Sequence, residues 1–230
     1  FAWQHFSHED YDRYLRQYVT PGLEWARLDV GRSGLEESGV ESKWDAFRLE
    51  KVFRSDHGAP VTIVLRLAAE PVDRDRYGGP SELLLTVAFP PGEPEIRFDV
   101  QWFDKPESRL PQAGWFSFSP KCSPEARWRL QKLGSWIDPC EVVSNGSRSM
   151  HAVQEYVDCL WDAYAVRIRT LDAPLLSPGW YSLLNFTNEL PEMARGVHFN
   201  LYNNVWSTNF PSWYGGSARF RFVLRLHSDV

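Results

Sequence analysis

The sequence predicts an all-β protein, an antiparallel β-sandwich or supersandwich that carries a short N-terminal helix. Its main signal is a two-residue alternation of apolar and polar side chains, which sends one set into a core and the other toward solvent. This alternation is clearest over residues 95–103 and recurs at 164–169, 197–202 and 219–226. Many short segments joined by Gly/Pro turns, with one good helical pattern, favour a sandwich over a βαβ fold.

The helix is expected over residues 7–19. Ser7 followed by Asp10 is typical of a capped helix start, and apolar side chains then recur at helical spacing. Pro21 and Gly22 end the helix. The polar, Gly/Ser-rich stretch that follows is expected to be a linker or an ordered crossing loop.

Further strands are expected where apolar runs are short. The runs at 61–68 and 83–89 are almost continuously apolar, as in strands covered on both faces. The intervening DRDRYGGPS is expected to be a turn-rich connection. Segments 44–54, 113–118 and 180–186 bring the total to about nine strands. The arginines of the terminal strand (Arg219, Arg221 and Arg225) are expected to form a solvated or salt-bridged face.

The composition excludes several classes of protein. The 230 residues are 43% hydrophobic and 24% charged, close to the globular average, so disorder is not expected. The net charge of -5 gives no electrostatic reason to expect nucleic acid or an anionic membrane as a partner. No apolar run approaches the ~20 residues of a membrane helix. Because the chain begins with Phe1, we expect a longer natural protein; its compartment stays open.

Cysteine and histidine patterns do not predict a metal site. Cys122, Cys140 and Cys159 match no zinc spacing, and free or buried thiols are favoured over a Cys122–Cys140 bridge, which stays the alternative. The histidines are scattered, without an HExxH motif, and are expected to be surface or packing residues. We therefore expect neither a metal nor another cofactor in this chain.

Residues 201–216 form the most distinctive polar and aromatic segment. Amides and hydroxyls beside aromatic faces suit neutral sugars, which present hydroxyl edges and apolar faces. The alternative is that the asparagines satisfy backbone groups of a tight loop while the tryptophans close the end of the sandwich. The candidate carbohydrate-binding residues are Asn203, Asn204, Trp206, Asn209 and Trp213.

A second polar segment, residues 103–111, contains two candidate catalytic carboxylates. Asp104 and Glu107 could form an acid/base pair for glycoside hydrolysis, which needs two carboxylates roughly 5 to 9 Å apart. Their neighbours Lys105 and Arg109 favour a structural role instead, because salt bridges would keep both carboxylates ionised. Since nucleophile and phosphate-loop motifs do not occur either, no catalytic residue is assigned.

Several stretches resemble a known family. They are HFSHEDYDRYLRQYV (5–19), FDKPESRLPQAGWFSF (103–118), WRLQKLGSWIDPCEVVSNGSRSMHAV (128–153), TLDAPLLSPG (170–179) and GVHFNLYNNVWSTNFPSWYGGSARFRFVL (196–224). Together they resemble the DUF5054 family, which is related to glycoside hydrolase family 38 α-mannosidases. Ser207 departs from the family pattern WGTNF, which has glycine at that position.

The resemblance implies a context for the chain. A full-length relative would carry an upstream α/β-barrel with a metal-dependent retaining mannosidase-type site, and a divalent metal such as zinc would belong to that region. This portion would be the C-terminal β-supersandwich, similar to galactose mutarotase-like folds. On that basis residues 1–43 are expected to be helix and linker from the upstream catalytic region, and residues 44–230 the supersandwich domain.

Three hypotheses of function follow. The first is an accessory domain that packs on and supports a catalytic barrel, with that barrel and carbohydrate as its partners. The second is an independent carbohydrate-binding module. The third is a structural or interaction domain whose Asn/Trp segment only caps the sandwich.

Overall fold

The computed structural model describes residues 1–18, 22–23, 32, 34–45, 47–55, 58, 60–123, 125–184, 187–206 and 213–228. Within these ranges the helices are α1 (His8–Tyr18), α3 (Pro71–Tyr77) and the 3-10 helix η1 (Met193–Arg195). None of these helices is long and apolar enough to cross a membrane.

The described strands form two sheets. The strands of the first sheet are β1 (Ala2–His5), β2 (Lys43–Asp45), β7 (Gln112–Phe118), β10 (His151–Ala152), β13 (Leu175–Pro178) and β14 (Val197–Asn203). Those of the second are β3 (Phe47–Ser55), β4 (Val61–Ala69), β5 (Glu82–Phe89), β6 (Glu95–Lys105), β8 (Arg127–Lys132), β9 (Ser135–Ile137), β11 (Tyr156–Trp161), β12 (Tyr164–Thr170) and β15 (Gly216–Ser228).

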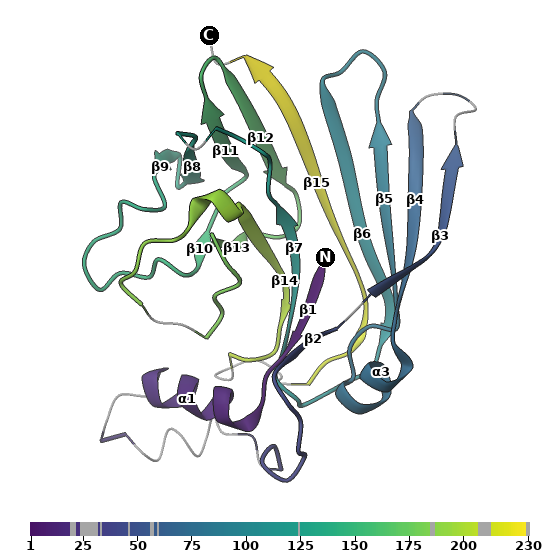
Figure 1. Ribbon diagram of the computed structural model, residues 1–230, viewed down its shortest axis with the longest axis vertical. Coiled ribbons are helices and arrows are strands. Elements are labelled where there is room, and N and C mark those ends of the chain that lie inside the picture. Colours follow the sequence, from purple (N-terminus) through teal and green to yellow (C-terminus); the bar gives the residue numbers. More distant parts are fainter. Residues whose placement is uncertain are drawn as a thin grey trace.

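Figure 1 shows how the strands are arranged in the two sheets. Among the described residues the six-stranded sheet has the order β10-β13-β14-β7-β1-β2, and the nine-stranded sheet the order β3-β4-β5-β6-β15-β12-β11-β8-β9. Each neighbouring pair is antiparallel. The expected all-β antiparallel sandwich with a short N-terminal helix is therefore confirmed.

The core lies between the two sheets. Alternate residues of β6 and β15, among them Val100, Trp102 and Phe222, meet residues of β7 and β14 such as Phe116 and Phe199 in one buried cluster. The period-two pattern predicted this inward face, because successive strand side chains point to opposite sides of a sheet. Burying a side chain of this size contributes about 1.5–3 kcal/mol, so this cluster dominates the stability of the fold.

A second buried cluster lies on the other side of the six-stranded sheet. There α1 places Tyr11, Tyr14 and Leu15 against Trp115 of β7. The Oγ atom of Ser7 accepts a hydrogen bond from the Asp10 backbone N–H at 3.2 Å, which is the expected helix cap. The predicted helix is thus confirmed over the residues that are described.

Strand β1 was missed by the sequence analysis. It lies between β7 and β2, and its Trp3 is fully buried against Trp102, with the two ring centroids 5.5 Å apart. Four residues are too few to show an alternation, so the sequence carried no signal for it. The division of the chain after residue 43, and the origin of residues 1–43 in an upstream catalytic region, stay predictions.

The expectation of a turn-rich connection before β5 is partly wrong, because α3 occupies the first part of this connection. Pro71 stands at the start of this helix and Gly78, with φ +76°, ends it. Proline first and glycine last is a favourable arrangement for a short helix, since proline needs no N–H donor there and glycine adopts the left-handed conformation without strain.

The strand expected at 180–186 is also wrong for the described residues 180–184. The strand lies earlier, at Leu175–Pro178, and Gly179 with φ +73° turns the chain away from the sheet. Tyr181 and Leu183 then pack over the outer side of the six-stranded sheet. The apolar run reflects this packing and not the pleat of a strand.

Candidate functional site

The end of β14 positions the described residues of the Asn/Trp segment. The Oδ1 atom of Asn203 accepts hydrogen bonds from the backbone N–H groups of Val205 and Trp206, at 2.8 and 3.3 Å. Asn204 is buried: its Nδ2 donates to the carbonyls of Ser108 and Leu110, and its Oδ1 accepts from the Gln112 N–H. Both amides thus satisfy backbone groups, as the structural alternative expects.

A groove of about 480 Å³ opens beside this turn. Tyr202 and Tyr214 form its aromatic wall, with ring centroids 4.7 Å apart, and the Tyr202 hydroxyl donates to the Tyr214 carbonyl at 3.3 Å. The remaining lining residues are Leu175, Asn200, Leu201, Asn203 and Trp206. Asn203 and Trp206 therefore meet in one groove, whose volume lies in the range of small-molecule sites.

The other predicted sugar-binding residues lie elsewhere or are not described. Asn204 is occupied by backbone contacts, and Asn209 lies outside the described residues. Trp213 is about half exposed, and the Arg109 guanidinium lies 4.7 Å from its ring centroid. Sequence reasoning did not single out Tyr202 and Tyr214, although both belong to the segment that it named. Carbohydrate binding by any of these residues stays a prediction.

Lys105 lies beneath the aromatic wall. Its side chain is buried, its Nζ donates to the Pro106 carbonyl at 2.9 Å, and the Tyr202 ring centroid is 4.7 Å from Nζ. Burial lowers the pKa of Lys105 to about 8. Lys105 therefore does not form the expected salt bridge with Asp104 or Glu107, and that expectation is corrected: the Pro106 carbonyl and the Tyr202 ring hold its ammonium group instead.

Histidines within the described ranges form no metal centre, since no group of three His, Cys, Asp or Glu residues there could hold an ion. The Nε2 atom of His5 instead lies 2.9 Å from both carboxylate oxygens of buried Asp45. His198 Nδ1 lies 2.8 Å from Ser117 Oγ, which is 2.9 Å from the Tyr181 hydroxyl. Burial lowers the pKa of His198 to about 4, so this imidazole is neutral at pH 7.

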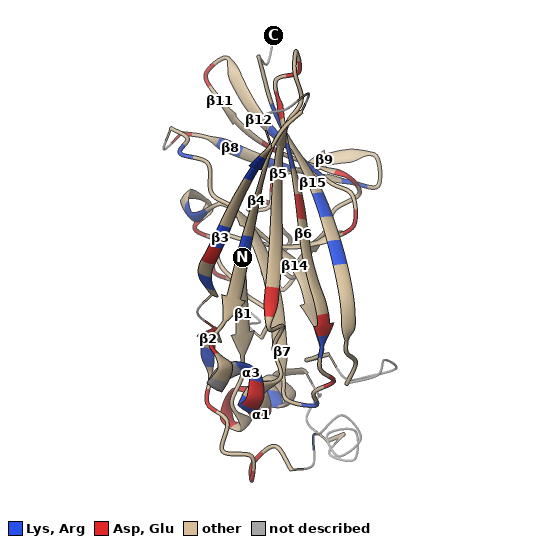
Figure 2. Cartoon of the chain, turned by 90° about the vertical axis from the view of Figure 1, so that its right-hand side faces the viewer, with Lys and Arg blue, Asp and Glu red and all other residues tan. Residues whose placement is uncertain are grey.

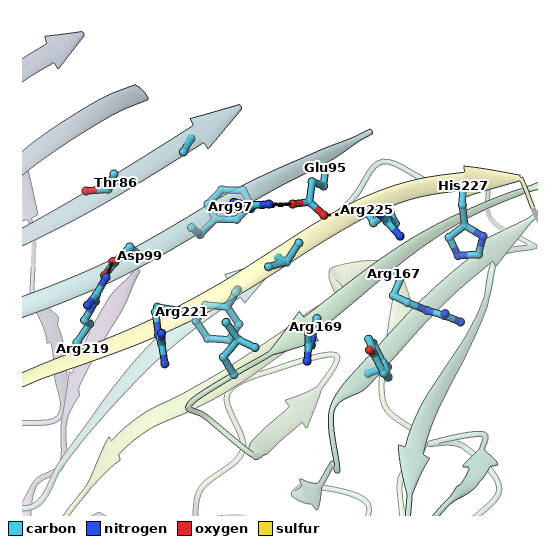
Figure 3. A pocket seen from close by; sticks show the side chains of 16 residues that line it. Thr86, Glu95, Arg97, Asp99, Arg167, Arg169, Arg219, Arg221, Arg225 and His227 are labelled. Carbon is cyan, nitrogen blue, oxygen red and sulfur yellow. Dashed lines mark hydrogen bonds and ion pairs between the residues drawn. The ribbon is translucent and has the colours of Figure 1, made fainter. Parts of the chain in front are cut away.

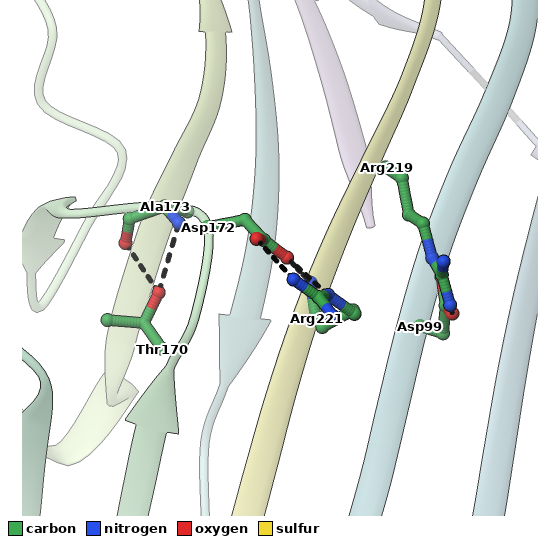
Figure 4. Close-up of polar contacts among 6 residues, drawn as sticks. All are labelled: Asp99, Thr170, Asp172, Ala173, Arg219 and Arg221. Atoms are coloured by element: carbon green, nitrogen blue, oxygen red, sulfur yellow. Dashed lines mark hydrogen bonds and ion pairs between the residues drawn. The ribbon is translucent and has the colours of Figure 1, made fainter.

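The outer face of the nine-stranded sheet carries a second and larger groove, of about 740 Å³ (Figure 3). Arginines from β6, β12 and β15 line it, and Figure 2 shows basic residues in bands along β15. Arg221 donates two hydrogen bonds to the Asp172 carboxylate, each 2.9 Å long, and Arg219 pairs with Asp99 (Figure 4). The salt-bridged face expected from the terminal strand is therefore present.

The inner face of the nine-stranded sheet is covered by the six-stranded sheet over only part of its width. One row of directly opposed residues runs from buried Val100 through half-buried Leu85 and Leu65 to Val52, which is 53% exposed. Figure 1 shows β3, β4 and β5 extending beyond the six-stranded sheet. Among the described residues, an apolar sheet face thus continues from the core to the surface.

Comparisons with known proteins place the fold. No family model matches the sequence, and no curated protein matches it. The structure is similar to an alpha-mannosidase from Enterococcus faecalis V583, with a TM-score of 0.54 and 9% sequence identity, over 82% of this chain and 23% of that chain. It also matches a protein in the glycosyl hydrolase family 38 from Enterococcus faecalis, with a TM-score of 0.49 and 9% identity, over 81% of this chain and 24% of that chain.

The first of these likenesses shows a shared fold. The chain spans about a quarter of the length of both solved structures. The narrower assignment to the DUF5054 family has no matching family model and stays a prediction.

Proposed function

We propose that this chain is a non-catalytic β-sandwich domain of an α-mannosidase-like glycoside hydrolase and that it packs against the catalytic part of that protein. The fold likeness supports the context, because 82% of this chain corresponds to only 23% of an α-mannosidase. In that enzyme a fold of this kind is one part of a larger protein.

The observation that carries the proposal is the uncovered apolar face of β3, β4 and β5. Large exposed apolar patches on a soluble protein mark surfaces that pack against a partner. Val52 at its edge is 53% exposed, whereas Val100 in the same row is fully buried beneath the six-stranded sheet. A catalytic domain packed on this face would bury the remainder of the row and extend the core.

The test compares two neighbouring residues of β3 that point to opposite faces. Val52 lies on the apolar inner face, and Phe53, 45% exposed, lies on the outer face in the row of Thr86 and Asp99. In the protein with its adjoining catalytic region, Val52→Glu is expected to lower the melting temperature and the hydrolysis of aryl mannosides. Phe53→Glu should change neither.

The 230-residue chain alone supplies the second arm. There Val52→Glu should lower the melting temperature much less than in the longer protein, because about half of the side chain is already exposed. Equal behaviour of the two variants in the longer protein, or hydrolysis of aryl mannosides by the 230-residue chain itself, would contradict the proposal.

The groove at the end of β14 supports a second candidate function, a carbohydrate-binding module. Its two tyrosine rings, Trp206 and Asn203 offer the combination of aromatic face and amide that sugars require. If the module hypothesis is correct, mannosides bind to the chain in calorimetry and Trp206→Ala abolishes binding without unfolding. Trp180→Ala, at a site 49% exposed and outside this groove, is the matched control.

A further inference from the structure

A row of charged residues crosses five strands on the outer face of the nine-stranded sheet. In register they are Arg129 (β8), Asp158 (β11), Arg167 (β12), Arg225 (β15) and Glu95 (β6). Arg167 and Arg225 are direct partners on adjacent strands, and directly opposed like charges destabilise a sheet. The row therefore holds two adjacent cations without a carboxylate between them.

The carboxylates near this row are shared. Fully buried Asp158 lies 2.7 Å from Arg129 Nη2 and accepts hydrogen bonds from Arg167 Nε and Nη2, both at 2.8 Å. Burial alone would raise the pKa of Asp158, but hydrogen bonds from Arg167 and Arg129 hold it below its usual range. A single carboxylate thus serves two guanidinium groups and stays ionised.

Glu95 is shared in the same way. It lies 2.7 Å from Arg97 Nη2 and 3.7 Å from Arg225 Nη2. Glu93, the additional partner of Arg97 at 3.6 Å, is 46% exposed, and such a contact contributes little. Asp158 and Glu95 are thus each shared by two arginines at this end of the groove, whereas Arg219 pairs with Asp99 and Arg221 with Asp172.

The neighbouring row adds to this positive region. Arg169 and Arg97 flank Val223 in register, and Arg169 also contacts Glu155. Aromatic rings lie among the guanidinium groups: Arg167 is 5.2 Å from the Tyr156 ring centroid and 5.5 Å from that of Trp136. Figure 3 shows Arg97, Arg167, Arg169 and Arg225 gathered around β15.

We propose that this end of the groove binds an acidic oligosaccharide, one whose sugar units carry carboxylate or sulfate groups, with Arg225 holding the anionic group beside the Arg167–Asp158 pair. The choice of a saccharide rests on the proposed function, whereas the requirement for an anion follows from the arginines alone. Guanidinium groups bind carboxylate and sulfate through paired N–H donors, and the groove volume of about 740 Å³ accommodates a few sugar units.

The experiment uses the 230-residue chain and measures binding of polygalacturonate, a sulfated glycosaminoglycan, neutral mannan and polyglutamate by calorimetry at low salt. At least one of the two acidic glycans is expected to bind and neutral mannan not to bind in the arginine groove. Arg225→Gln should weaken acidic-glycan binding about tenfold, because it removes the charge-assisted hydrogen bonds to the anionic group. Arg225→Lys should restore part of it.

Arg13→Gln is the control for the loss of one positive charge. Arg13 lies on α1, at the opposite end of the molecule from the C-terminal part of β15, with a side chain 69% exposed and paired to Asp10. This variant should bind as the unmodified chain does. Raising the salt to 0.5 M should also weaken binding, because salt screens exposed charges.

Three results would overturn the proposal: no binding of either acidic glycan, equal loss in Arg225→Gln and Arg13→Gln, or polyglutamate binding as tightly as the glycans. The last would show that the site does not select a saccharide. None of these results bears on the Val52→Glu experiment, so failure here and failure of the proposed function are distinguishable.

Discussion

The thiol sulfurs of Cys122 and Cys159 lie 2.9 Å apart. Cys159 is buried on β11, and Cys122 lies between β7 and β8. All three cysteines are free, as the sequence favoured, but the alternative pairing of Cys122 with Cys140 is wrong. The register of β11 brings Cys159 to Cys122, and no cysteine spacing could show that.

We therefore expect a mild disulfide oxidant such as oxidised glutathione to join Cys122 to Cys159. Cys122 would attack first, because burial raises the pKa of the Cys159 thiol and keeps it protonated. A disulfide typically stabilises by about 2–4 kcal/mol, which corresponds to a rise in melting temperature of roughly 5–15 °C. Thiol titration should show two of the three thiols lost.

Cys140→Ser should oxidise as the unmodified chain does, and Cys122→Ser should show no rise in melting temperature. Recovery of a Cys122–Cys140 peptide after digestion would contradict the expected pairing.

Because Lys105 is buried, we expect the chain to become more stable at alkaline pH. Its pKa in the folded chain is about 8, because of burial, whereas an unfolded lysine titrates near 10.5. Between these values the unfolded state binds more protons, so the free energy of unfolding rises with pH. Between pH 8 and 10.5 the free energy of unfolding of the unmodified chain should rise by up to about 3 kcal/mol relative to that of Lys105→Met. Urea denaturation at a series of pH values measures this difference. A constant difference across that range would contradict this expectation.

The elements that could be predicted from the sequence are those with a periodic pattern among neighbouring residues. The Ser7 cap, the helix after it and the alternation over 95–103 each depend on neighbouring residues, and the structure confirms them. β1 has four residues, and β11 carries the buried Asp158 at a position where its sequence shows no simple alternation. Such strands are stable because of distant partners, which a local pattern does not contain.

The same distinction applies to the candidate sites. Asn203 and Trp206 could be named because aromatic and amide residues are adjacent in the sequence. The pairing of Arg167 with Arg225 joins residues 58 positions apart through strand register. A solvated or salt-bridged face was expected for Arg225, but the sharing of Asp158 and Glu95 becomes visible only when five strands are aligned.

His198 predicts a loss of stability in acid. Burial lowers its pKa to about 4, whereas an unfolded histidine titrates near 6.5. As the pH falls from 6.5 to 4, this histidine becomes protonated in the unfolded state but stays neutral in the folded state. The free energy of unfolding therefore decreases by up to about 3 kcal/mol. His198→Gln, whose amide can keep the contact with Ser117, should lose less stability over this range. An identical pH profile for both chains would contradict the assignment.

Gly114 faces Trp3 across β7 and β1, and this contact predicts the effect of adding one methyl group. A Cβ atom at Gly114 would lie 2.6 Å from Cζ3 of the Trp3 ring, and the fully buried ring cannot move aside because it packs against Trp102 and Tyr202. Overpacking of a core costs about 1–3 kcal/mol, so Gly114→Ala should lower the free energy of urea unfolding by that amount.

Gly134, with φ +81° and no atom within 4 Å of its added Cβ, is the control for backbone strain alone. Gly134→Ala should cost about 1–2 kcal/mol, and Trp3→Phe should relieve part of the Gly114→Ala loss, because the smaller ring leaves the space that the new methyl group needs. If Gly114→Ala is equally costly with Trp3 and with Phe at position 3, the cost does not arise from this contact.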